Sequence, residues 1–148
     1  MEAKGIDFEN TVSYLFTQVA TAYRNRLEKK MVEIGLHSGQ VFVLFELWKK
    51  DGQSQVRLAE KLNVTPPTVN KMLKGLSDAG FLYCAKDEDD GRTTRAYLLE
   101  KGEEIRELIE DQWHELEEES LPGLTGIEKL LLYQLLAKLH ESYFLKGV

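Results

Sequence analysis

The sequence contains few of the residues that build covalent or metal-bound frameworks. It has one cysteine, Cys84, in 148 residues, which leaves no internal disulfide pair and no four-cysteine metal site. The three histidines, His37, His114 and His140, are scattered. The His-x-x-x-His spacing that places two ligands on one helix face is missing, because Glu118 follows His114 at that spacing. We therefore expect no cofactor and no metal ion.

Long apolar runs and catalytic motifs are also missing. No segment approaches the roughly 20 apolar residues that cross a bilayer, and the first residues, MEAKGIDFEN, lack the basic and then apolar pattern of a signal peptide. The sequence has no phosphate-cradling glycine loop and no Ser/His/Asp or Cys/His set at a recognisable spacing. These absences predict a cytoplasmic protein that is not an enzyme and does not enter membranes.

Positive charge is scarce for a protein that would bind nucleic acid. The formal net charge is −6, whereas contacts to phosphate need Lys and Arg. The distribution is uneven, because residues 38–98 hold nine Lys or Arg against eight Asp or Glu and the rest of the chain is strongly acidic. The total charge therefore neither excludes nor supports DNA binding.

Four long segments carry apolar residues at the three- and four-residue steps of an amphipathic helix. Gly35 is a natural stop for the first segment and Ser38 a suitable cap for the second. The segments are residues 6–34, 38–50, 101–120 and 125 to about 144.

Two shorter helices are predicted between these segments. The first covers residues 54–62, and Asn63 after it tolerates the left-handed conformation of a tight turn. Thr65 then caps the second, with Pro66 at the first helical position, where a missing N–H costs nothing. The residues predicted to face inward are Val56, Ala59 and Leu62 on the first helix, and Val69, Met72, Leu73 and Leu76 on the second.

After Gly80 the pattern changes to that of β-strands. Residues 81–85 and 95–98 predict two strands, and the polar segment KDEDDGRTT between them predicts a hairpin with a charged tip. Two short helices followed by such a hairpin predict a winged helix-turn-helix, in which the second short helix enters the major groove of DNA. On an isolated helix such a face would more simply be an ordinary solvated surface, but the hairpin that follows, with Arg92 at its tip, favours DNA contact. The candidate DNA-contacting residues of this helix are Thr65, Pro67, Thr68, Asn70, Lys71 and Lys74.

The run LAEKLNVTPPTVNKMLKGLSDAGFL, followed by DGRTTRAYLLEKG, resembles the MarR family of bacterial and archaeal regulators. The order of the helices extends the resemblance over nearly the whole chain. Its most specific part is Asp90-x-Arg92, followed by Leu98 and Gly102. The resemblance implies that Arg92 reaches into the minor groove and that Asp90 positions it. It also makes Arg95 a weaker candidate for contact with the DNA backbone.

The chain departs from the family pattern in three places. Cys84 and Ala85 stand where the family often has wing arginines, and Leu99 stands where a threonine commonly caps the next helix. The wing tip also carries Asp87, Glu88 and Asp89, which repel phosphate. We therefore expect modest affinity for DNA at physiological salt.

The terminal helices carry more apolar surface than a winged helix covers, which predicts that two subunits pair through them. The alternative is a monomer in which these helices fold back onto their own domain. The predicted fold is mainly α with a small β-hairpin wing, divided into a helical dimerisation region at residues 1–36 and 101–148 and a winged helix-turn-helix domain at residues 37–100. The residues that carry the apolar surface are Phe8, Val12, Leu15, Trp113, Leu131, Leu135 and Leu139.

Together these features predict a ligand-responsive transcriptional repressor that binds double-stranded, pseudo-palindromic operator DNA as a homodimer. The alternative is a winged-helix module that binds protein without sequence-specific DNA binding. The resemblance also implies a small amphipathic or aromatic effector, bound where the dimerisation helices meet the DNA-binding domain. The candidate lining residues, which an ordinary core would also explain, are Tyr23, His37, Phe42, Phe45 and Trp48. A redox role for Cys84 is disfavoured, because Lys86 is the only cation near it in the sequence.

Overall fold

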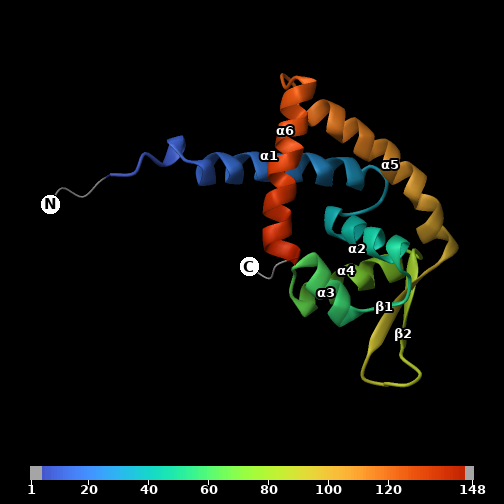
Figure 1. Cartoon of the computed structure of the whole chain (residues 1–148). Coiled ribbons are helices and arrows are strands. Elements are labelled where there is room, and N and C mark those ends of the chain that lie inside the picture. Colours follow the sequence, from blue (N-terminus) through green and yellow to red (C-terminus); the bar gives the residue numbers. More distant parts are fainter. Residues whose placement is uncertain (1–4, 146–148) are drawn as a thin grey trace.

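The computed structural model describes residues 5–145 and is mainly helical, with one small antiparallel sheet (Figure 1). The predicted order of four helices, a two-stranded wing and two helices is confirmed. The elements are, in chain order, η1 (Phe8–Asn10), α1 (Val12–Val32), α2 (Ser38–Lys49), β1 (Gln53–Ser54), α3 (Gln55–Leu62), α4 (Pro66–Asp78), β2 (Leu82–Lys86), β3 (Thr94–Leu98), α5 (Glu100–Ser120), α6 (Gly126–His140) and the π-helical turn η2 (Glu141–Leu145).

The first helix is shorter than predicted. It begins at Val12 because Thr11 caps it, with the Thr11 hydroxyl accepting the backbone N–H of Tyr14 at 3.2 Å. The preceding residues form the separate turn η1. At the other end Gly35 has φ of +83°, a left-handed conformation that glycine adopts without strain, so the predicted stop is confirmed.

The start of α2 corrects one prediction. Ser38 is the first helical residue and not the cap, which is His37. The His37 backbone N–H donates to the side-chain oxygen of Gln40 at 2.8 Å. The Ser38 N–H donates to Oε2 of Glu28 at 2.7 Å. The free amides at this helix end are therefore satisfied by side chains, one of them from α1.

The two short helices meet at the predicted turn. Asn63 has φ of +53°, and the Thr65 hydroxyl accepts the backbone N–H of Thr68 at the start of α4. Val56 does not face inward as predicted, because it is 64% exposed. Leu58 takes that place beside Ala59, and both are buried against the core.

The sheet has the order β1-β3-β2, with β3 in the centre. The predicted hairpin is confirmed, and its strands begin one residue from the predicted positions, at Leu82 and Thr94. Strand β1 was not predicted. It has only two residues, Gln53 and Ser54, and pairs with β3 through Gln53 opposite Ala96. A strand of this length is too short for an alternating pattern to show in the sequence.

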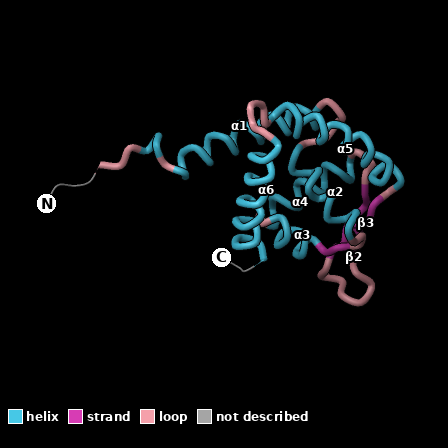
Figure 2. The backbone as a smooth tube through the Cα atoms, turned by 45° about the horizontal axis from the view of Figure 1, so that its top comes forward, coloured by secondary structure: helices cyan, strands magenta, loops and turns pink. Residues whose placement is uncertain are grey.

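One continuous core joins α2, α3, α4 and the sheet to the inner parts of α1 and α5. In contrast, α6 has no buried residue, and α1 buries only Leu27 and Met31 near its C-terminal end. The N-terminal half of α1 extends away from the rest of the chain (Figures 1 and 2). Both terminal helices therefore leave apolar side chains exposed, as the sequence predicts.

One residue of that predicted apolar surface belongs elsewhere. Trp113 on α5 is half-buried and its ring lies edge-on to Phe42 and Phe45 of α2. It therefore joins α5 to α2 and is not left for a partner helix.

Candidate nucleic-acid interface

Helix α4 presents one buried and one exposed side. Val69, Leu73 and Leu76 are buried, and the helix packs closely on α2. A Cβ atom added to Gly75 would lie 2.5 Å from the side-chain nitrogen of Gln40. This close crossing fixes the direction in which the opposite side of α4 faces solvent. The predicted DNA-contacting residues of α4 are all exposed: Thr65, Pro67, Thr68, Asn70, Lys71 and Lys74.

Three of these exposed residues already have partners. The Lys74 ammonium lies 3.1 Å from Oδ2 of Asp78 one turn along the helix. Both groups are well exposed, so this ion pair is weak and can exchange for a phosphate contact. The Thr65 and Thr68 hydroxyls are 2.9 Å apart. The helix start is therefore ordered, with small polar groups at its surface.

The wing tip is held by aspartate side chains. Oδ1 of Asp90 accepts the backbone N–H of Arg92 at 3.0 Å, and Oδ2 accepts the Thr93 hydroxyl at 3.0 Å. Oδ1 of Asp87 accepts the backbone N–H groups of Asp89 and Asp90. Asp90 thus contacts Arg92 through the backbone, which fixes the turn, while the Arg92 side chain is exposed at the tip.

Arg95 has a structural role that the sequence did not reveal. Its Nε donates to Oδ2 of Asp87 at 2.5 Å, and its Nη1 donates to the carbonyl oxygen of Gly52 at 3.0 Å. The guanidinium lowers the pKa of Asp87, and the Asp87 carboxylate raises the pKa of Arg95. One of the three acidic residues expected to repel phosphate is therefore neutralised within the wing.

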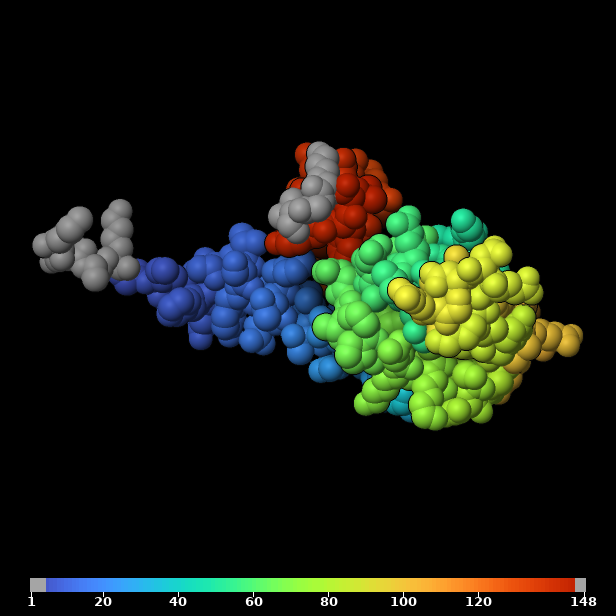
Figure 3. Space-filling view, turned by 90° about the horizontal axis from the view of Figure 1, so that it is seen from below, coloured from blue at the N-terminus to red at the C-terminus, as the bar shows by residue number. Residues whose placement is uncertain are grey.

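The wing and the helices α3 and α4 occupy the same face of the molecule (Figure 3). The wing, whose tip carries Arg92, and α4, which carries the exposed residues named above, therefore lie on one surface. A duplex that contacts one of these elements can reach the other.

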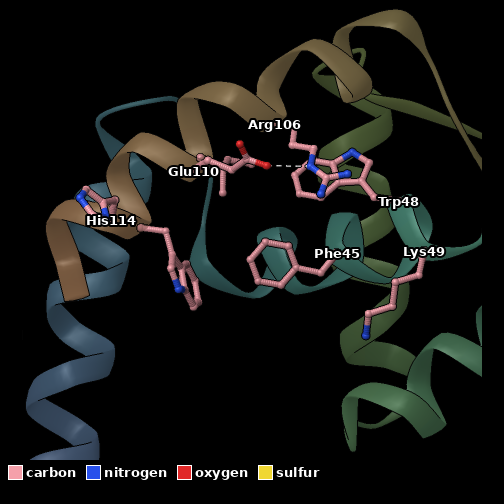
Figure 4. Close-up of a pocket in the computed structure, with 8 residues that line it drawn as sticks. Phe45, Trp48, Lys49, Arg106, Glu110 and His114 are labelled. Carbon is pink, nitrogen blue, oxygen red and sulfur yellow. Dashed lines mark hydrogen bonds and ion pairs between the residues drawn. The ribbon is translucent and has the colours of Figure 1, made fainter. Parts of the chain in front are cut away.

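A second candidate site lies between α2 and α5. It is an open cavity of about 620 Å³, lined by aromatic rings from both helices and by charged side chains (Figure 4). Arg106 stacks over Trp48, with 5.2 Å between the guanidinium carbon and the ring centroid. Its Nε also donates to Oε1 of Glu110 at 2.8 Å. The lining residues are Phe45, Trp48, Lys49, Arg106, Ile109, Glu110, Trp113 and His114.

The structure brings together only part of the predicted effector lining. Phe45 and Trp48 line the cavity, and Phe42 packs on Phe45 behind it. Tyr23 is half-buried against the core. The pKa of its hydroxyl is raised, mainly by this burial and to a smaller extent by the negative charge of Glu117. His37 is exposed and bonded to Glu28 at 2.6 Å. Neither residue lines this cavity.

The α5 side of the cavity was missed by the sequence reasoning. A usable signal was present, because Arg106, Ile109, Glu110 and Trp113 recur at the three- and four-residue steps of one helix face. Which helix this face would meet depends on tertiary packing. The sequence pattern alone does not contain that information.

Cys84 is exposed on β2, and partial burial raises the pKa of its thiol. This is opposite to the shift that a reactive thiolate needs. Within residues 5–145 no three His, Cys, Asp or Glu side chains are grouped so that they could hold a metal ion. None of the helices in the same range has the length and apolar character that a membrane crossing requires.

Comparison with known proteins finds a sequence-family model that matches the middle of the chain. The model of the MarR family matches residues 36–94. The chain is 27% identical over 134 residues to the HTH-type transcriptional regulator BilQ of Clostridium symbiosum, which covers 90% of this chain and 93% of that protein. It is 25% identical over 135 residues to an HTH-type transcriptional repressor of Mycobacterium tuberculosis, covering 91% and 97% of the two chains.

Solved structures share the fold. A MarR transcriptional regulator from Methanosarcina mazei superposes with a TM-score of 0.82 at 23% identity, over 93% of this chain and 98% of the other. Bordetella bronchiseptica BpsR superposes with the same TM-score at 19% identity, over the same shares of the two chains. The BpsR structure concerns the mechanism by which 6-hydroxynicotinic acid regulates the DNA binding of that protein. These likenesses confirm the mainly helical winged-helix fold.

Proposed function

The chain carries the MarR-family domain over residues 36–94, and from this premise we propose that it is a transcriptional repressor that binds operator DNA. One observation carries the proposal. Helix α4, whose exposed side is polar, and the wing, whose tip carries the exposed Arg92, occupy the same face of the molecule (Figure 3). A helix of this kind fits the major groove, and an arginine on the wing then reaches the adjacent minor groove.

The residues take different parts in this proposal. Asn70 and Thr68 have the donors and acceptors that read base edges, and Lys71 and Lys74 suit guanine edges or phosphates. Arg92 contacts the minor groove. Arg95 supports the wing through Asp87 and Gly52, so its contribution to binding is partly structural.

We propose that the active form is a homodimer. Its dimerisation region comprises residues 1–36 and 101–148, of which the structure describes 5–36 and 101–145, and residues 37–100 form the DNA-binding domain. Support comes from the large apolar side chains on α1 and α6 that are more than half exposed, since patches of this size usually mark interfaces. They include Val12, Leu15, Val19, Ile127, Leu130, Leu131 and Leu135. A two-fold dimer reads a pseudo-palindrome with half-sites about one helical turn apart.

We further propose that the cavity between α2 and α5 binds a small aromatic effector. The rings of Phe45, Trp48 and Trp113 provide flat apolar contact. The cavity connects the proposed dimerisation region to the DNA-binding domain, because α5 belongs to the first and α2 to the second. A ligand that changes their packing would shift the population of the DNA-competent form.

The second candidate function is a winged-helix module that binds protein, which the net charge of −6 permits. Selection of bound duplexes from a random DNA pool separates the two functions. A repressor enriches one motif with two-fold symmetry, and its affinity falls as salt rises. Recovery of no motif, together with salt-independent or undetectable duplex binding, would favour the protein-binding module.

A further inference from the structure

A second groove lies beside the wing, between the start of α3 and β3. It has a volume of about 430 Å³. Four of the seven residues that line it are cations, and they come from three separate parts of the chain. The lining residues are Lys50, Gly52, Gln53, Ser54, Arg57, Lys61 and Arg95.

The cations of this groove differ in how strongly they are held. Arg57 and Glu60 are 3.8 Å apart and both are 64% exposed, so solvent screens their attraction. Lys61 lies 3.4 Å from Oε2 of Glu46. Glu46 also bonds Lys49 at 3.1 Å, so one carboxylate is shared between two ammonium groups.

The remaining two cations complete the groove. Lys50 is exposed at the end of α2. Arg95 is fixed by Asp87 and by the carbonyl oxygen of Gly52 through Nε and Nη1. The residues that line the groove include no Asp or Glu, so its lining is positively charged in a chain that is acidic as a whole.

The position of this protein groove, beside α4 and the wing, indicates which part of a DNA duplex it would contact. A helix in the major groove and a wing in the adjacent minor groove lie on opposite sides of one sugar-phosphate strand, because that strand separates the two grooves. Helix α3 packs on α4, and Arg95 belongs to the wing strand β3. The cationic groove between α3 and β3 therefore lies beside both α4 and the wing, the two elements that flank that strand in the proposed function.

We propose that this protein groove holds backbone phosphates of the DNA strand that separates the major groove from the minor groove. Arg57, Lys61 and Lys50 make the contacts. The inference rests on the proposed function and adds three contacts to it. Phosphate contacts fix orientation and carry no base information. These residues therefore contribute to affinity for every sequence equally, whereas the α4 side chains distinguish one sequence from another.

The test measures binding of the full chain to a duplex of arbitrary sequence over a series of salt concentrations. The Arg57→Gln/Lys61→Gln double variant should reduce the log-log salt slope by about 0.9 for each phosphate that the protein no longer neutralises, and weaken binding at about 0.1 M salt by roughly fivefold to tenfold for each such phosphate. Lys50→Gln is a second variant, and it should act in the same direction. Thermal unfolding of each variant confirms that it is folded.

The matched control is Arg24→Gln/Lys29→Gln, which removes the same charge from exposed positions on α1. It should leave the slope as in the wild type. An equal reduction in the control would overturn the proposal, because the effect would then follow net charge and not the groove. A wild-type slope in both groove variants would overturn it while leaving the repressor assignment intact.

Two further outcomes are informative. No duplex binding by the wild-type protein would overturn the groove proposal together with the proposed function. Calorimetric titration of the wild-type protein with inorganic phosphate forms the second arm. Saturable phosphate binding that the double variant loses, with an unchanged DNA slope, would assign the groove to a free anion and overturn the contact with DNA.

Discussion

The indole N–H of Trp48 donates a hydrogen bond of 2.9 Å to the backbone carbonyl of Gly102. This bond connects the end of α2 to the first turn of α5, directly after the wing. Gly102 is buried there against the backbone of Phe81, whose carbonyl oxygen also accepts the N–H of Leu99. The contact therefore joins the wing and both helices that line the aromatic cavity.

Gly102 is required for this close approach. A Cβ atom at this position would lie 2.2 Å from the Phe81 carbonyl oxygen and 3.0 Å from Cδ2 of Leu98. The backbone must move to relieve the first contact, so Gly102→Ala should lower the free energy of unfolding by about 1–3 kcal/mol or more. Urea denaturation at neutral pH measures this change.

The matched control is Gly126→Ala at the start of α6, where a new Cβ meets nothing within 4 Å. Because alanine favours helix over glycine, this variant should be as stable as the wild type or more stable by up to about 1 kcal/mol. Equal stability of the two variants would show that the junction tolerates a methyl group.

The second prediction concerns the wing. Arg92→Ala should weaken operator binding by about 1–3 kcal/mol, the range for one good groove contact. The side chain is exposed at the wing tip, so the oligomeric state and the unfolding transition should not change. Fluorescence anisotropy with the selected operator measures the effect. Unchanged affinity would show that Arg92 does not contact DNA.

The third prediction separates the charge of Asp90 from its geometry. Asp90 holds the turn by accepting the Arg92 N–H and the Thr93 hydroxyl. Asp90→Asn keeps an acceptor and removes a charge that repels phosphate, whereas Asp90→Ala removes both bonds. The Asp90→Asn variant should therefore bind the operator more tightly than the Asp90→Ala variant. The expected difference in binding free energy is about 0.5–1.5 kcal/mol, the range for one missing hydrogen bond. The reverse order would mean that the wing turn forms without this side chain.

Local signals explain what the sequence predicts well. Asn63, Thr65 and Gly35 determine their own backbone geometry, because a left-handed turn, a hydroxyl cap and a positive φ depend on one residue and its immediate neighbours. Apolar periodicity then identifies the helices between them. The element order and the exposed side of α4 follow from these signals.

Contacts between distant segments explain what was missed. Arg95 bonds Gly52, which is 43 residues away, and the α5 side of the cavity faces α2 only after folding. The pattern marks a residue as polar or apolar, but it does not identify the partner. His37 shows the same limit, since its bond to Glu28 of α1 places it outside the cavity. The sequence pattern therefore predicts the elements of both candidate sites and only part of their lining.

The fourth prediction tests the dimer. Leu135 on α6 is 59% exposed, and a carboxylate at a paired apolar surface would be buried without a partner. Leu135→Glu should convert a dimer at micromolar concentration into a monomer, as measured by light scattering. Val56→Glu is the control, because this 64% exposed valine lies on α3 and should leave the dimer intact. A wild-type monomer would contradict the pairing of the terminal helices.

The fifth prediction uses the contact between α1 and the start of α2. Oε1 of Glu28 bonds Nδ1 of His37 at 2.6 Å, and Oε2 accepts the Ser38 N–H at 2.7 Å. The pKa of Glu28 lies below its ordinary value of 4.5. The largest cause is the hydrogen bond to His37, and the second is the hydrogen bond from the Ser38 backbone N–H. A carboxyl whose pKa is lower in the folded chain stabilises the fold above the unfolded pKa, and this stabilisation is lost as the pH falls through the folded pKa.

The consequence is a stability difference that depends on pH. Glu28→Gln should lower the free energy of unfolding at neutral pH by about 0.2–1 kcal/mol, the range for a partly exposed pair. The difference should shrink as the pH falls below 4.5, because the wild-type carboxyl then takes up its proton as well. Urea denaturation at several pH values gives both curves, and Glu33→Gln controls for the loss of a nearby exposed charge. Parallel curves for the wild type and Glu28→Gln at every pH would show that the ionised carboxylate does not connect α1 to α2.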